Sequence, residues 1–140
     1  MELVCPHCGA VNRVPAERLK QQPKCGKCGA EVLPAHPVEL TAANFEKFIG
    51  RNELPVIVDF WAPWCGPCKQ FAPTYSQMAG QYVGSVRFAK VNTEAEQSLA
   101  GRHSIRSIPT LALFKQGKEV DRVAGALPAA QLQSWLARHL

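Results

Sequence analysis

The sequence lacks several features that would assign the protein to a familiar functional class. It contains no stretch of about 18 apolar residues, so no membrane-spanning helix is expected. Its first residues, Met1 to Cys5, contain no basic segment followed by an apolar one and a cleavage site, so we expect no secretory signal. There is also no glycine-rich dinucleotide fingerprint, and we therefore expect neither flavin nor NADPH to bind this chain.

Charge of one sign is in excess, because the formal net charge is +5 over 140 residues. A basic chain invites a nucleic-acid interpretation, which depends on how the charges are distributed. Residues 1–32 hold five lysine or arginine side chains and three glutamates, and the thiolates of a metal site there would cancel that excess. The remaining charge is spread like that of an ordinary solvated surface. We therefore expect no nucleic-acid partner.

Cysteine is frequent and regularly spaced. The six cysteines form three Cys-x-x-Cys pairs, and one pair directly follows the segment 56–64, which begins with an apolar run. If that run is a buried strand and Gly66 begins a helix, Cys65 lies at the helix N-terminus, where free N–H groups and the helix dipole favour a thiolate. Cys68, one turn further along, faces the same way and can close a disulfide with Cys65. The pair predicts a two-electron redox centre with Cys65 as the nucleophile.

The other four cysteines have the spacing of a zinc site. Two residues separate the cysteines within each pair and sixteen separate the pairs, whose members are Cys5, Cys8, Cys25 and Cys28. Gly9 and Gly29 follow each pair and permit the turn with positive φ that a metal knuckle needs. We predict one structural zinc ion held by the four thiolates, with His7 as an alternative to one of them. Lys24 and Lys27 either offset the thiolate charge or are solvated surface residues.

Length and apolar content predict two units joined by a linker. Residues 1–32 have too few large apolar side chains for a core of their own, so a metal would have to stabilise them. Two prolines mark residues 33–37 as the linker. Residues 38–140 alternate between strand and helix patterns, which predicts an α/β domain with a mixed central sheet flanked by helices. The expected strands are 55–60, 86–91, 110–114 and 120–123, and the expected helices are 41–50, 66–82, 94–102 and 128–140.

The motifs of residues 38–140 resemble those of the thioredoxin family along the whole domain. The matching segments are Asp59-Phe60-Trp61-Ala62, Trp64-Cys65-Gly66-Pro67-Cys68-Lys69, Ala89-Lys90-Val91-Asn92, Ile105-Arg106-Ser107-Ile108-Pro109-Thr110 and Gly125. With the four-cysteine extension, the entire chain is similar to the zinc-binding bacterial thioredoxin 2 group of that family. The resemblance implies the thioredoxin fold with a small N-terminal zinc-ribbon-like domain.

The resemblance also implies roles for residues around Cys68. Asp59 interrupts an apolar strand, where a carboxylate is costly unless it has a partner or a function. By resemblance it lies beneath Cys68 and assists proton transfer, with Lys90 nearby. The alternative is an aspartate at the end of a strand that reaches solvent. Trp61 packs close to the active site or belongs to the ordinary core.

A surface for binding substrates is implied by the same resemblance. The family has a cis peptide bond before the residue that corresponds to Pro109, which leaves the backbone of Ile108 free to pair with an extended segment of substrate. The residues expected to form this flat surface are Trp64, Gly66, Pro67, Ile108, Pro109 and Gly125.

These features together predict a monomeric, cytoplasmic protein-disulfide reductase that cycles between dithiol and disulfide. A flavin-containing, NADPH-dependent thioredoxin reductase would recharge it, and disulfide-containing proteins would be its clients. The cytoplasm is favoured because thiols and zinc thiolates persist under reducing conditions. Two other classes stay open. One is an interaction module that uses the thioredoxin domain as a scaffold, and the other is a redox sensor or zinc-dependent chaperone whose metal is expelled by oxidation.

Overall fold

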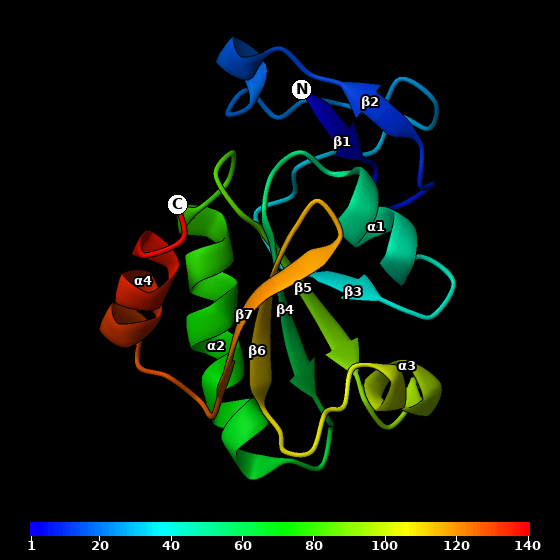
Figure 1. The fold of residues 1–140 in the computed structure, drawn as a ribbon. Coiled ribbons are helices and arrows are strands. Elements are labelled where there is room, and N and C mark those ends of the chain that lie inside the picture. The colour runs from blue at the N-terminus through cyan, green and yellow to red at the C-terminus, as the bar shows by residue number, and fades with distance from the viewer.

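A mixed sheet of five strands forms the centre of the larger unit (Figure 1), in a computed structural model that describes residues 1–140. The strand order is β3 (Val38–Leu40), β5 (Arg87–Asn92), β4 (Val56–Trp61), β6 (Thr110–Lys115) and β7 (Lys118–Ala124). The first three strands in this order are parallel, whereas β6 and β7 are each antiparallel to the preceding strand. The apolar, β-branched sequence of β4 suits its central position, where five of its six residues are buried.

Helices cover both faces of this sheet. The helices are α1 (Phe45–Arg51), α2 (Gly66–Gln81), α3 (Gln97–Arg102) and α4 (Ala129–Ala137). Side chains alternate between the faces along β4, so Ile57 packs with residues of α2 and α4, whereas Val58 packs with residues of α1 and α3. No helix is both long enough and apolar enough to cross a membrane.

The N-terminal unit lies at one end of the sheet, beside α1 (Figure 1). It consists of an antiparallel hairpin, β1 (Glu2–Val4) and β2 (Val11–Arg13), a short 3-10 helix, η1 (Ala16–Arg18), and the loop that carries Cys25 and Cys28. Its apolar cluster includes Leu3 and Val32 but also Leu54, which belongs to the larger unit. The extension therefore packs against the larger unit and shares a small core with it.

A buried arginine links the two units. Arg87, at the start of β5, is only 4% exposed, and its guanidinium donates hydrogen bonds to the Val4 carbonyl at 2.7 Å, to Asn52 Oδ1 at 3.0 Å and to the Val32 carbonyl. Its Cζ also lies 4.6 Å from the centroid of the Phe48 ring. Burial lowers the pKa of Arg87 to about 9, so the side chain is still protonated at neutral pH. The extension thus supplies two of the acceptors that satisfy this charge.

The sequence pattern predicts the main elements of the larger unit and misses the smaller ones. The four expected strands and four expected helices are present, with boundaries shifted by a few residues. The helix expected from residue 41 begins at Phe45, because Thr41 and Asn44 form a hydrogen-bonded turn before it. The strands β1, β2 and β3 were not expected, since each has only three residues.

Candidate functional site

The redox cysteines lie where β4 leads into α2. Cys65 has extended backbone angles (φ −82°, ψ 113°) and is the N-cap residue of α2, so its Sγ accepts a hydrogen bond from the Cys68 backbone N–H at 3.2 Å. Pro67 fits the first turn because its missing N–H would have no partner there. The two cysteines form a disulfide, with Cα atoms 5.2 Å apart.

The disulfide lies against the loop before β6. Cys65 and Cys68 are 5% and 3% exposed, and Trp61 and Ile108 pack against them. The Cys65 Sγ lies 3.9 Å from the Ile108 carbonyl oxygen. The Ile108–Pro109 peptide bond is cis, as the family resemblance predicts. The Cys65 sulfur therefore lies next to the backbone of Ile108, which comes 43 residues later in the sequence.

The residues expected to bind substrate surround the disulfide. Trp64 is 67% exposed, more than any other large apolar side chain of the protein, and Gly66 and Pro67 beside it are also exposed. Gly125 has a φ of +103° and donates its N–H to the Pro109 carbonyl at 2.8 Å, which brings the end of β7 to the same place. The structure thus gathers these residues from three separate segments.

Asp59 lies in a cavity behind the disulfide. It is 3% exposed, and its Oδ1 has no hydrogen-bond partner, so the alternative of a solvent-exposed aspartate is wrong. The cavity has a volume of about 80 Å³, and Cys68 and Lys90 line it together with Asp59. Burial raises the pKa of Asp59 to about 7, against the opposing effect of Lys90 and with a further increase from Glu39. Asp59 can therefore exchange a proton near neutral pH.

Two aromatic residues also line this cavity. Trp61 lies beneath the Lys90 ammonium, whose Nζ is 4.6 Å from the indole centroid, and it also packs against the two redox cysteines. The Tyr75 hydroxyl lies 2.7 Å from the Ala89 carbonyl and 3.0 Å from the Ile57 carbonyl. Burial raises the pKa of Tyr75, so it stays neutral. The position of Trp61 favours the interpretation that it belongs to the active site.

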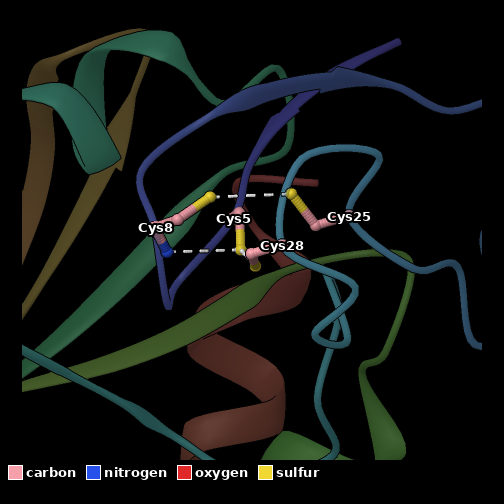
Figure 2. Close-up of side chains that lie close together, drawn as sticks. All are labelled: Cys5, Cys8, Cys25 and Cys28. Carbon is pink, nitrogen blue, oxygen red and sulfur yellow. Dashed lines mark hydrogen bonds between the residues drawn. The ribbon is translucent and has the colours of Figure 1, made fainter.

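The remaining four cysteines form one compact cluster in the extension (Figure 2). All four sulfurs lie within 4.8 Å of one another, and the pairs Cys5–Cys28 and Cys8–Cys25 are each 3.6 Å apart. Zinc–sulfur bonds of about 2.3 Å place the corners of a tetrahedron about 3.8 Å apart. The donor set and the spacing therefore fit a zinc ion.

The two cysteine loops repeat the same local geometry. Gly9 and Gly29 have φ angles of +77° and +79°, and their N–H groups donate to the carbonyls of Cys5 and Cys25 at 2.9 Å. This left-handed conformation is the one that glycine adopts without strain. The Asn12 amide donates to the Cys25 Sγ at 3.4 Å, and this bond and nearby backbone N–H groups lower the pKa of Cys25 to about 6. The donors around Cys25 thus favour a thiolate at that ligand.

The other polar residues near this cluster are not ligands. His7 is exposed and lies outside the group of converging metal-ligating side chains, so the alternative of a histidine ligand is not supported. The Lys24 ammonium faces the Glu31 carboxylate at 3.6 Å. Lys27 contributes its backbone N–H, which lies 3.4 Å from the Cys25 Sγ. Backbone and amide donors therefore stabilise the sulfurs more directly than the lysine charges do.

A disulfide at a helix N-terminus, with a buried acid behind it and a cis-proline loop beside it, defines a thiol–disulfide oxidoreductase. Comparisons agree: the family described as Thioredoxin matches residues 36–138, and the one described as Thioredoxin 2, N-terminal, matches residues 4–30.

Named relatives extend this likeness. Thioredoxin C-3 of Corynebacterium nephridii is 49% identical over all of this chain and 96% of its own length. Thioredoxin 1 of a Nostoc species is 45% identical over 73% of this chain and 95% of its own length, and thioredoxin 1 of Synechococcus elongatus is 48% identical over 72% and 94%. The chain belongs to the thioredoxin family. It is a protein-disulfide reductase with a four-cysteine zinc-ribbon cluster in its N-terminal extension.

Proposed function

We propose that Cys65 is the attacking thiolate in a two-step exchange. Its sulfur attacks one sulfur of a client disulfide, the client S–S bond breaks, and one client thiolate leaves while a mixed disulfide forms. Cys68 then gives up its proton and attacks the Cys65 sulfur, which forms the Cys65–Cys68 disulfide and releases the second client thiolate. The client gains two electrons, and the two protons that complete its thiols come from solution and from Cys68.

One observation carries the assignment of the nucleophile. Cys65 is the N-cap of α2, and its Sγ already accepts the Cys68 N–H at 3.2 Å. In the reduced protein the same donor and the helix dipole stabilise a negative charge on that sulfur. Cys68 lies inside the first turn, and its sulfur has no such donor, so it needs a base.

Asp59 is the base that we assign to Cys68. The two residues line one cavity, and a carboxyl whose pKa is about 7 accepts a proton at neutral pH and can release it again. The assigned role of Lys90, on the neighbouring strand, is to stabilise the carboxylate once it forms.

The client would bind across the exposed surface around the disulfide. An extended client segment can pair with the backbone of Ile108, next to the Cys65 sulfur, while Trp64 offers apolar contact area. The residues that we assign to this surface are Trp64, Gly66, Pro67, Ile108, Pro109 and Gly125.

The extension would hold one zinc ion through Cys5, Cys8, Cys25 and Cys28. Bound zinc supplies a structural cross-link, because a site with four protein ligands has no open coordination position for catalysis. We place the protein in the cytoplasm, since a dithiol reductant and a thiolate metal site both need a reducing compartment. Its proposed state is a monomer. A thioredoxin reductase would supply its electrons.

A trapping experiment tests the order of attack. The Cys68→Ser variant, incubated with a disulfide-containing client such as insulin, should accumulate a mixed disulfide through Cys65, whereas Cys65→Ser should accumulate none. Mass spectrometry of the non-reduced adduct identifies the linked cysteine. An adduct through Cys68 in the Cys65→Ser variant, formed at the same rate, would contradict the assigned order of attack.

A further inference from the structure

Lys90 stands between two carboxylates on one face of the sheet. Strand β5 lies between β3 and β4, and Lys90 is paired in register with Glu39 on one side and with Asp59 on the other. Residues paired directly across neighbouring strands project from the same face. The three side chains therefore form a row from the exposed edge strand to the buried centre of the sheet.

Lys90 forms an ion pair with neither Glu39 nor Asp59. Its Nζ lies over the Trp61 ring at 4.6 Å, and none of the six ion pairs of the structure involves it. Asp59 has an oxygen without any hydrogen-bond partner although the residue is 3% exposed. The single positive charge of Lys90 thus interacts with two carboxylates without direct contact, and the buried carboxyl of Asp59 keeps an oxygen without a hydrogen-bond partner.

We propose that Glu39 is a positioning residue for the disulfide exchange: it competes with Asp59 for Lys90 and thereby keeps the Asp59 carboxyl ready to take and release a proton. This inference rests on the proposed role of Asp59 as the base for Cys68. The redox site then extends to the edge of the sheet, to a residue that touches neither sulfur.

The electrostatic directions agree with this arrangement. Glu39 raises the pKa of Asp59, and Lys90 lowers the pKa values of both acids. Replacing Glu39 by glutamine would remove a like charge and would leave Lys90 to Asp59 alone. Because both changes favour the Asp59 carboxylate, both lower its pKa.

Other groups around Asp59 do not take over this role. The titratable groups that line the same cavity from α2 and β5 are Cys68, Lys69, Tyr75 and Lys90. Tyr75 is buried and neutral, with its hydroxyl against two backbone carbonyls. Lys69 is exposed and solvated. Glu39 is therefore the acid whose charge acts on Asp59, and the charge of Glu96 acts in turn on Glu39 and raises its pKa.

The test is a titration of Asp59 in the oxidised full-length protein. Carbon-13 NMR of the side-chain carboxyl, assigned by its loss in Asp59→Asn, gives the pH of half protonation in the wild type and in Glu39→Gln. We expect this pH to fall by about half a unit, less than the 1–3 units produced by a charge in direct contact, because Glu39 acts across Lys90. The matched control is Glu46→Gln, which removes the same charge from an exposed residue of α1 that faces Arg102.

Activity provides a second readout. In insulin reduction, the acidic limb of the pH–rate profile should move to lower pH in Glu39→Gln, and Glu39→Asp, which keeps the charge, should restore it toward the wild type. An Asp59 titration that is unchanged in Glu39→Gln, with a slowed Asp59→Asn, would overturn this inference alone. A wild-type rate in Asp59→Asn across the pH range would overturn the proposed base and this inference with it.

Discussion

The same Cys-x-x-Cys spacing forms a disulfide in one region of the molecule and half of a metal site in another. At the start of α2 the backbone continues as a helix after Cys68, which keeps the two Cα atoms 5.2 Å apart and lets the sulfurs bond. In the extension a glycine with positive φ follows each pair, and the sulfurs approach partners from the opposite loop, with Cys5 facing Cys28. The residue that follows the second cysteine, Lys69 in the redox pair and a glycine in each metal pair, therefore distinguishes the disulfide site from the metal site.

The two regions also differ in what stabilises them. Apolar clusters of 14 and 12 buried residues lie in the larger unit, with Val4 of the extension as one of the 14, whereas the cluster of the extension has seven residues, one of which is Leu54 of the larger unit. A core of that size does not fold a chain segment by itself. The redox loop thus rests on a large core, while the metal loops depend on a metal ion and on their contact with the larger unit.

The largest expected effect separates the two kinds of cysteine pair. Cys65→Ser should lower insulin reduction by at least about a thousandfold, because the attacking sulfur is removed. Cys8→Ser, the matched change in the extension, should release zinc and keep turnover within about threefold, since no catalytic group lies there. Turnover with thioredoxin reductase and metal content by mass spectrometry check both. Retained function in Cys65→Ser would instead favour an interaction module.

The next effect is the response of stability to pH at Asp59. Its folded-state pKa of about 7 exceeds the ordinary 3.8, so the folded protein binds the proton more tightly and loses stability as pH rises from about 4 to about 7. Asp59→Asn should remove this loss and raise the free energy of unfolding at pH 8 by up to about 4 kcal/mol, with little change near pH 4. Urea unfolding at both pH values measures it, and an equal effect at both would contradict the burial of a charge.

A smaller effect concerns the junction between the two regions. Arg87→Met should destabilise the protein by about 3 kcal/mol, because the buried carbonyls of Val4 and Val32 lose their donor. Arg102→Met, at an exposed residue that faces Glu46, should change stability by less than about 0.5 kcal/mol. Thermal unfolding of the zinc-loaded proteins compares the two. Equal effects would show that the junction contributes no more than a surface ion pair.

The smallest effect tests the loop geometry of the metal region. Gly9→Ala should cost about 1 kcal/mol, because alanine resists a φ of +77° even though little lies near its Cβ. Gly50→Ala is the matched control: Gly50 lies in α1 with open space around a Cβ, and alanine there should be neutral or stabilising by about 0.5–1 kcal/mol. Unfolding of both variants with zinc bound gives the comparison. A loss at Gly50 equal to that at Gly9 would refute the argument from φ.

Much of the larger unit could be predicted because its elements are long and periodic. The apolar run of β4 and the helical spacing of α2 place Cys65 at a helix start without any knowledge of the fold. The three-residue strand β3 carries no such signal, and it exists because β5 pairs with it. Glu39 was missed for that reason, since only the alternation Val38-Glu39-Leu40 hints at a strand with one polar face.

Arg87 shows the same limit for the extension. In the sequence it is a basic residue at the start of a strand, a place where arginine is usually solvated. Its burial depends on carbonyls more than fifty residues earlier in the chain. No local pattern records that contact.

The sequence by itself determined the local structural features of this protein. These are the helix start that favours a thiolate, the glycine turn after each metal-binding pair, and the spacing that groups the six cysteines into two redox and four metal-binding residues. These follow from backbone preferences within a few residues of each cysteine. Only the tertiary structure decided which side chains share a cavity with Asp59 and which carbonyls satisfy Arg87. Packing of segments distant along the chain sets burial and charge environment, and both act through space.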